Sequence, residues 1–149
     1  MMHGIRRQLS TALVIISLSA AGLTLPGGAK ADETLFARLG DGPAVSAVVE
    51  QFTARILDDD RISTRYANTD IENWRGHLRD FVCSATGGGC EYSGRAMKSA
   101  HARMAIRDDE FDWTAEHLIA TLNDLNVPAR EHQELMTAIA SLRDQVVGW

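Results

Sequence analysis

FVCSATGGGCEYSGRAMKSAHARMAI, residues 81–106, is the stretch of sequence that decides the fold. Its three consecutive glycines, 87–89, must end any helix that reaches them, because glycine readily leaves the helical conformation. A shorter helix is expected to start at Ser93-Gly94. Its apolar face would carry Met97, Ala100, His101 and Met104. The stretch therefore predicts two helices joined by a glycine hinge, with a histidine on the apolar face of the second.

The helix before the hinge is expected to begin at Asp70, a good N-cap residue. Its apolar side is formed by Ile71, Trp74, Leu78, Phe81, Val82 and Ala85. His77 lies three residues after Trp74 and four before Phe81, so it shares their face. If the two helices pack around a flat apolar ligand, His77 and His101 can face each other. Imidazole is a natural ligand of haem iron.

Two other interpretations of these histidines stay open. A histidine on an apolar helix face is usually a core residue satisfied by a hydrogen bond. Met97, His101 and Met104 also form a stripe of soft ligands that would suit Cu(I), although methionine stripes are more often core packing. His117 and His132 have acidic neighbours, so we expect them near the surface.

Helical periodicity continues through the rest of the chain, without a convincing strand. Asp41-Gly42-Pro43 opens one helix, Asp108 is expected to cap another, and the segment 126–128 separates that helix from the last one. Their apolar stripes are Val45, Val48, Val49, Phe52 and Ile56; Phe111, Ala115, Leu118, Leu122 and Leu125; and Leu135, Ile139, Leu142 and Val146. The predicted fold class is all-α, with four principal helices and short pieces between them.

The first 31 residues have the order of a secretory signal. Arg6 and Arg7 precede an apolar run, 11–25, and a small-residue cleavage site, 29–31, follows. The run is shorter than the roughly 20 residues of a membrane span, although an uncleaved anchor is an alternative. We predict a signal peptide over 1–31 and one domain over 32–149. The mature protein is expected to be periplasmic or secreted, without stable membrane insertion.

The charge of the chain argues against a nucleic-acid partner. Removal of Arg6, Arg7 and Lys30 with the signal changes the net charge from −5 to −8, whereas phosphate binding needs clustered cations. The sequence also contains no H-E-x-x-H, Walker or G-x-S-x-G motif, and no residue is predicted to be catalytic.

Cys83 and Cys90 lie on either side of the glycine hinge. Export would place them in an oxidising compartment, which favours a disulfide, although two free thiols are the alternative. The spacing is not that of a zinc site, and without C-x-x-C-H there is no signal for covalent haem attachment.

The segment from Thr34 to Gly148 resembles a group I truncated haemoglobin. The resemblance rests on TLFARLGDGPAV at residues 34–45, on the paired glycines 87–88, on Tyr92-Ser93-Gly94-Arg95, and on Met97 to His101. It implies a two-over-two helical sandwich around haem b (iron protoporphyrin IX), with His101 as the proximal iron ligand. Export and the cysteine pair resemble a smaller, exported branch of that family.

The resemblance places Phe52, Thr53, Trp74, Leu78 and Val82 around the distal side, and Tyr66 at the haem edge. Many members have Tyr where this chain has Thr53, and Gln where it has Leu78. A bound, partly anionic oxygen is held by hydrogen bonds, so tight O2 storage is not expected.

His77 occupies the position of a second axial histidine in some cyanobacterial members, which implies that His77 and His101 could both bind iron. Alternatively, His77 pairs with a haem propionate. Arg95, Lys98 and Arg75 are further propionate candidates, because cations near the haem would pair with its carboxylates.

The predicted function is binding of O2, NO or another diatomic gas, with NO dioxygenase or redox activity as a further possibility and an unknown reductase as partner. One alternative is a bis-histidine protein for electron transfer or redox sensing. The other is a haem-free periplasmic protein that binds a metal or a partner protein.

Overall fold

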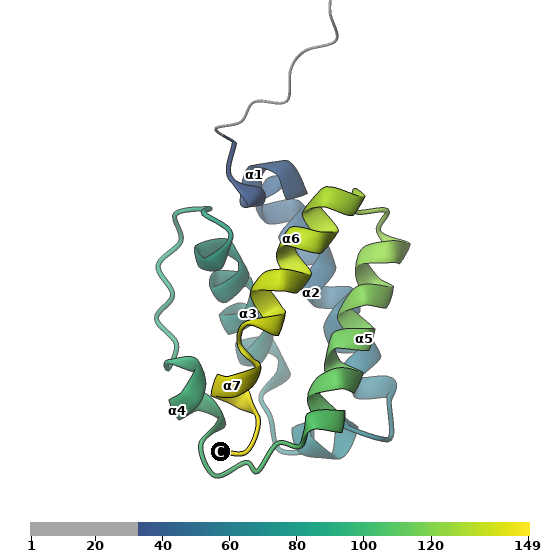
Figure 1. Cartoon of the computed structure of the whole chain (residues 1–149), viewed down its shortest axis with the longest axis vertical. Helices are drawn as coiled ribbons and strands as arrows, with labels where there is room; N and C mark the ends of the chain where they lie inside the picture. The colour runs from purple at the N-terminus through teal and green to yellow at the C-terminus, as the bar shows by residue number, and fades with distance from the viewer. Residues whose placement is uncertain (1–32) are drawn as a thin grey trace, which may run out of the picture. The chain divides into compact units, whose positions relative to one another are not determined.

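The computed structural model describes residues 33–149, all of its named elements being helices (Figure 1). The predicted signal peptide lies outside the described residues. The helices are α1 (Leu35–Leu39), α2 (Asp41–Asp58), η1 (Ser63–Tyr66, a 3₁₀ turn), α3 (Ile71–Ala85), α4 (Met97–His101), α5 (Asp108–Asp124), α6 (Ala129–Ala140) and α7 (Arg143–Val146). Within residues 33–149, no helix is long and apolar enough to cross a bilayer.

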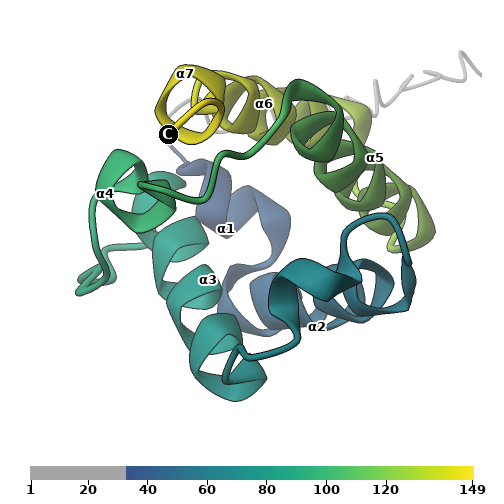
Figure 2. The same cartoon turned by 90° about the horizontal axis from the view of Figure 1, so that it is seen from below.

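The four long helices form two pairs, α2 with α3 and α5 with α6, and α2 also packs against α5. Viewed from below, the described helices form a ring, with α4 and α7 next to each other (Figure 2). A buried cluster joins α2, α5 and α6. It consists of Val48, Leu118, Leu122 and Leu135. These helices are held together by the apolar stripes that their sequences predict.

The expected helix starts are largely those of the structure. The Asp70 carboxylate accepts a hydrogen bond from the Asn73 backbone N–H at 3.1 Å, so Asp70 caps α3 as predicted. The expectation for Asp108 was wrong, because Arg107 is the N-cap of α5 and Asp108 is its first residue. The capping contact comes from Glu110, whose carboxylate accepts the Arg107 backbone N–H at 2.9 Å.

Two other helix boundaries differ from the expectation. The helix predicted from Ser93-Gly94 starts only at Met97, because the Tyr92 ring folds over Gly94 and its hydroxyl donates to the Arg95 carbonyl at 3.1 Å. The last predicted helix is divided, because α6 ends at Ala140. There the Leu142 N–H donates three residues back, to Ile139, which tightens the turn before α7.

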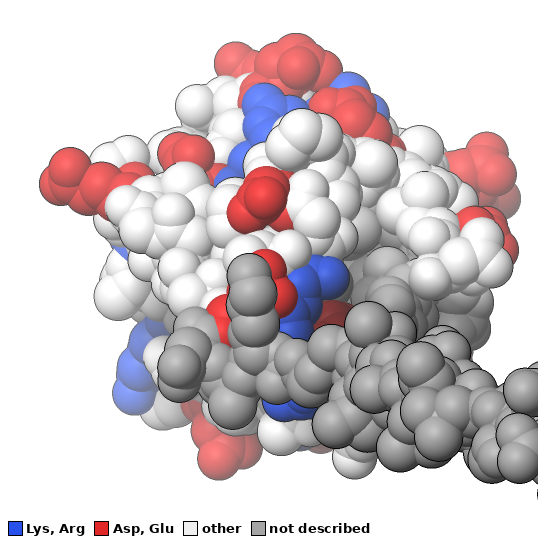
Figure 3. Space-filling view, turned by 90° about the horizontal axis from the view of Figure 1, so that it is seen from above, with Lys and Arg blue, Asp and Glu red and all other residues white. Residues whose placement is uncertain are grey.

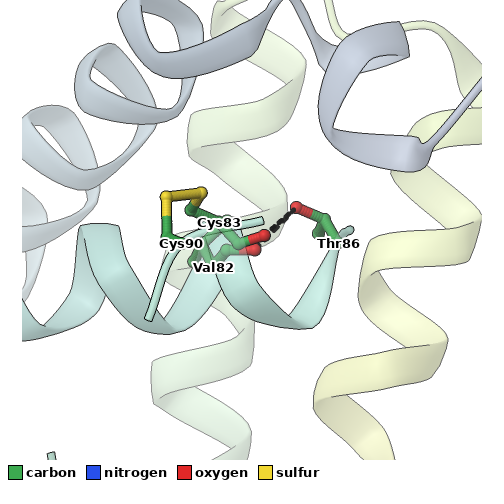
Figure 4. Close-up of a disulfide and its surroundings, with 4 residues drawn as sticks. All are labelled: Val82, Cys83, Thr86 and Cys90. Atoms are coloured by element: carbon green, nitrogen blue, oxygen red, sulfur yellow. Dashed lines mark hydrogen bonds between the residues drawn. A yellow bond between two sulfur atoms is a disulfide. The ribbon is translucent and has the colours of Figure 1, made fainter. Parts of the chain in front are cut away.

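The glycine hinge ends α3 as predicted. Gly87 and Gly89 have φ of 85° and 75°, which disfavours other residues, and a Cβ on Gly88 would lie 2.6 Å from the Cys83 sulfur. Cys83 and Cys90 are joined by a disulfide, with their Cα atoms 5.7 Å apart. Figure 4 shows this bridge beside Thr86, whose hydroxyl donates to the Val82 carbonyl at 2.6 Å. The disulfide therefore ties the loop after the hinge to the last turn of α3.

Candidate functional site

His101 is the last residue of α4 and is half-buried. Its Nδ1 lies 2.9 Å from the Met97 carbonyl oxygen. A carbonyl only accepts, so Nδ1 carries the proton and donates. Nε2 then keeps its lone pair, and the ring orientation is fixed by the other nitrogen, which is the arrangement of metal-binding histidines.

The apolar face of α3 is only partly covered by other side chains of the described domain. Trp74, Leu78, Phe81 and Val82 are half-buried, and Cys83 is the buried residue of this helix. His77, on the same helix, is also half-buried, and no residue between 33 and 149 makes a hydrogen bond or ion pair with it. An apolar helix face with a free imidazole is suited to a flat apolar group with a metal at its centre.

Thr53 is fully buried in α2, but its hydroxyl is already engaged. It donates to the Glu50 carbonyl at 3.1 Å and accepts from Arg75 Nε at 2.8 Å. The sequence suggested Arg75 as a partner for an external carboxylate. The structure instead pairs Arg75 with Glu72 and Glu50, at 2.8 and 3.4 Å.

Tyr66 and Trp74 stack on each other, with ring centroids 4.4 Å apart. Burial raises the pKa of the Tyr66 hydroxyl, which therefore stays protonated at neutral pH. In the described part of the chain, neither this hydroxyl nor the Trp74 indole N–H has a hydrogen-bond acceptor. Together with the His77 imidazole, these two groups are donors left on this side of the site after Thr53 is engaged.

An ion pair that the sequence did not predict links both sides of the site. Arg65 binds the carboxylate of buried Glu110 through two hydrogen bonds of 2.8 and 2.7 Å. A third bond, of 2.7 Å, runs from Arg65 to the Met104 carbonyl, three residues after His101. The Arg65 guanidinium holds the pKa of Glu110 below its usual range. Partners so far apart in the sequence leave no local signal.

The residues from Val147 to Trp149 hold the same loop from the other side. The Ala105 N–H donates to the Trp149 carbonyl at 2.6 Å, and the Gly148 N–H donates to the Ile106 carbonyl at 2.9 Å. The sequence offered no signal for these contacts either, because they are made by the backbone.

The chain is similar in sequence and fold to known globins. Residues 34–147 match the family model described as bacterial-like globin. A group 1 truncated haemoglobin of Synechocystis sp. is 35% identical over 113 residues, which are 73% of this chain and 88% of that protein. The relative from Tetrahymena thermophila is 33% identical, over 77% of this chain and 95% of its own. The chain belongs to the group 1 truncated haemoglobins.

Solved structures of truncated haemoglobins share the fold. The Fe(III) form of the protein from Tetrahymena pyriformis has a TM-score of 0.75 at 31% identity, covering 78% of this chain and all (100%) of that one. The 2/2 haemoglobin of Synechococcus sp. has a TM-score of 0.71 at 33% identity, covering 76% and 95%. The predicted family, the all-α two-over-two fold and haem b as the cofactor are thereby confirmed.

The residues of this truncated haemoglobin fit its cofactor. His101 offers Nε2, and the half-covered apolar side chains of α3 offer a surface for a flat ring. The cations suggested for its carboxylates have other contacts: Arg95 donates to the Ala100 carbonyl at 3.3 Å, and Lys98 Nζ lies 3.2 Å from the centroid of the Trp149 ring. Both side chains are nevertheless exposed.

A separate apolar cavity of about 230 Å³ lies between α1, α2 and the start of α6. Leu39, Val45, Val48 and Leu135 line it, together with Val82, which the sequence places beside the distal position. The cavity therefore reaches the helix face on which the candidate site lies.

Proposed function

We propose that this truncated haemoglobin binds a diatomic gas, O2 or NO, and that His101 is its proximal ligand. The observation that carries the proposal is the hydrogen bond from His101 Nδ1 to Met97, which leaves Nε2 for a metal. When bound by His101, haem would supply the iron to which the gas binds. The names of the relatives, which are haemoglobins, support the same function.

The distal side chains would hold a gas weakly. Phe52, Leu78 and Val82 are apolar. The Thr53 hydroxyl already donates its hydrogen bond to the Glu50 carbonyl. The donors that remain are His77, Tyr66 and Trp74, of which the last two stack on each other. Such a site favours ready exchange or turnover of a gas over tight storage. The apolar cavity lined by Val82 offers a space of low polarity next to this side.

The first experiment replaces the proximal histidine. Purified His101→Gly protein is expected to lose its Soret band, or to bind haem only when imidazole is added, because free imidazole can occupy the space of the ring. His132→Gly, at a half-buried position on α6, is the matched control and is expected to keep the band. Unchanged haem binding by His101→Gly without imidazole would refute the proposal.

A second candidate function rests on His77, which is half-buried without a partner among the described residues. If His77 were a second iron ligand beside His101, it would compete with the gas for the iron, and electron transfer or redox sensing would be the better description. His77→Leu separates the two functions. A sharp low-spin ferrous spectrum that becomes high-spin in His77→Leu supports the second ligand, whereas identical spectra exclude it.

Turnover as an NO dioxygenase is the finer form of the gas-binding proposal. NO and O2 combine to nitrate with the uptake of one electron, so the protein needs a donor of single electrons. The test is nitrate formation from NO by the O2-loaded protein with a regenerating reductant; release of NO without nitrate would exclude this activity.

Export is proposed from the order of residues 1–31 alone. Mass spectrometry of the protein from its native host is expected to find an N-terminus at Asp32. An intact Met1 in the cytoplasmic fraction would exclude the signal peptide.

A further inference from the structure

The positive charges of the described domain are distributed unevenly. Residues 33–149 contain twelve Arg and Lys side chains, and nine of them form ion pairs. The three that form none in this part of the chain are Arg95, Lys98 and Arg103. All three lie within nine residues of sequence that also contain His101. The unpaired cations therefore gather at the helix that carries the proximal histidine.

Acidic side chains are absent from the same stretch. Glu91 and Asp108 are the nearest acids in sequence, and between them residues 92–107 carry only positive charge. The neighbouring helix α7 adds no net charge, because it contributes Asp144 and an Arg143 that is paired with Asp108. By contrast, the end of the domain at α1 shows acidic side chains spread around its margin and fewer basic ones (Figure 3).

Exposed apolar side chains lie beside these cations. Met104 and Trp149 are 38% and 41% exposed, and they are two of the four exposed large apolar residues of the described domain. Trp149 stacks on Lys98, and Met104 follows Arg103 directly. We call these five residues, Arg95, Lys98, Arg103, Met104 and Trp149, the proximal surface.

The backbone under the proximal surface is held in place. Arg65 binds the Met104 carbonyl, and the Ala105 N–H donates to the Trp149 carbonyl. The surface thus combines three unpaired cations with two exposed apolar side chains on a fixed backbone, close in sequence to His101. Such a composition suits brief, charge-steered encounters with a protein of opposite charge.

We infer that the proximal surface docks an acidic protein that donates single electrons to the haem. Docking brings the donor next to α4; the donor loses one electron, and the iron changes from ferric to ferrous. Outside the three unpaired cations, the described domain has nineteen acids against nine cations, so an acidic partner is repelled elsewhere and oriented toward this surface. The inference rests on the proposed haem function.

Cross-linking tests the docking itself, apart from any electron transfer. Lys98 is the only lysine among residues 33–149, so it is the one side-chain amine of the described domain that a carbodiimide can join to a carboxylate of a partner protein. Oxidised plant-type [2Fe–2S] ferredoxin, a small acidic one-electron carrier, serves as the probe. We expect a one-to-one cross-linked product whose peptide map contains Lys98, and its loss in Lys98→Arg, which keeps the charge. A product that persists in Lys98→Arg would overturn the proposal.

Reduction kinetics test the role of the charge. Stopped-flow mixing of the ferric protein with reduced ferredoxin should give a rate that falls steeply between about 10 and about 300 mM salt. Lys98→Arg should retain this rate. Arg103→Glu should slow reduction about tenfold at low salt. Arg130→Glu is the control, because it makes the same charge change at an exposed position of α6, away from the proximal surface. It should alter the reduction rate less than about twofold.

Two results distinguish the ways in which the inference can fail. If Arg103→Glu and Lys98→Glu accelerate haem release to an apoprotein acceptor while the salt dependence of reduction stays unchanged, these cations bind the haem carboxylates, and docking is excluded. If the wild-type protein shows no Soret band, the haem function itself fails, and this inference with it. Unchanged haem release with a lost salt dependence supports docking.

Discussion

At the scale of single residues, the hydrogen bonds of the Thr53 hydroxyl determine whether this side chain can bind a gas on the proposed distal side. Its hydroxyl donates to Glu50 and accepts from Arg75, so it has no proton to offer to a gas. The family resemblance implies that Thr53 stands where many members have tyrosine, but it does not reveal that the hydroxyl is engaged. The partner is 22 residues away, on the neighbouring helix.

Thr53→Val should therefore affect stability more than gas binding. The loss of two hydrogen bonds at a fully buried site is expected to lower the free energy of unfolding by about 1 kcal/mol. The O2 dissociation rate should change by less than about twofold. Urea denaturation and stopped-flow displacement of O2 by CO measure the two quantities. A double-mutant cycle with Arg75→Met provides the control, because the two changes should not be additive. O2 dissociation at least about tenfold faster would show that Thr53 contacts the gas.

Asp59 gives the domain a pH-dependent contact between the end of α2 and α5. Hydrogen bonds from the Arg61 side chain and backbone, and from His117 Nε2 at 2.6 Å, hold the pKa of Asp59 well below its ordinary value of 3.8. A carboxyl whose pKa is lowered by folding stabilises the protein above its ordinary pKa, and the stabilisation is lost as the pH falls toward the folded value.

Asp59→Asn should therefore be less stable than the wild type at pH 7 and nearly equal to it in strong acid. The difference is expected to shrink as the pH falls below about 4. Urea denaturation at several pH values measures it. Asp60→Asn, which changes an exposed neighbour without an ion pair in the described domain, should leave the profile unchanged. A stability difference that does not depend on pH would contradict this account of Asp59.

At the scale of helices, α4 is too short to be stable alone. It depends on what lies before and after it: the Tyr92 ring over Gly94, the stacking of Lys98 on Trp149, and the bond from Ala105 to Trp149. The spacing of Met97 and His101 predicted that a helix carries the histidine. It did not predict where the helix begins, because a side chain outside the periodic pattern decides that.

Gly94→Ala should disturb the start of this helix. A Cβ at Gly94 would lie 2.3 Å from the Tyr92 ring, so the ring must move and haem should dissociate faster. Gly76→Ala is the matched control in the middle of α3, where nothing lies within 4 Å of the new carbon, and it should stabilise the protein by about 1 kcal/mol. Transfer of haem to an apoprotein acceptor measures the first effect, and thermal denaturation the second. Equal haem release by both variants would contradict the role of the Tyr92 contact.

The disulfide between Cys83 and Cys90 spans the glycine hinge that precedes α4. Cys83 and Cys90 are seven positions apart, so their bridge closes a short loop, and the loop-entropy relation gives about 2.5 kcal/mol of stabilisation. The Cys83→Ser/Cys90→Ser variant should be less stable by about this amount and keep its Soret band, because neither cysteine contacts His101 through a hydrogen bond. Comparison with the dithiothreitol-treated wild type controls for the serine hydroxyls. Equal stability with and without the bridge would contradict the estimate.

At the scale of the whole molecule, the limits of prediction follow the range of the contacts. Helices α2, α3, α5 and α6, their apolar stripes and the glycine hinge depend on neighbours within a turn or two, and the sequence predicted them. The division between α6 and α7, the bonds of Trp149 and the pairing of Arg65 with Glu110 depend on residues that meet only in the folded chain. The family motifs predicted His101 as the iron ligand, whereas the contacts that support its ring are properties of this chain.

Among these long-range contacts, the Arg65–Glu110 ion pair is expected to affect both the stability of the fold and the loop after His101. It joins η1, where Tyr66 stacks on Trp74, to the loop that follows His101, so it connects the proposed distal and proximal sides. Arg65→Met should lower the free energy of unfolding by about 2 kcal/mol, because it leaves the buried Glu110 carboxylate without its main partner. The same change should increase hydrogen exchange in residues 102–106 and accelerate haem release.

Arg130→Met removes an exposed ion pair on α6 and serves as the control, with an expected effect below about 0.5 kcal/mol. If Arg65→Met lowers stability but leaves hydrogen exchange in residues 102–106 at the wild-type level, the ion pair stabilises the fold without holding the proximal loop. The double variant Arg65→Met/Glu110→Gln separates the effect on stability from the effect on the loop. Without the carboxylate, no unpaired charge is left buried, so part of the lost stability should return. The contact from Arg65 to the Met104 carbonyl stays absent, so hydrogen exchange in residues 102–106 should remain increased.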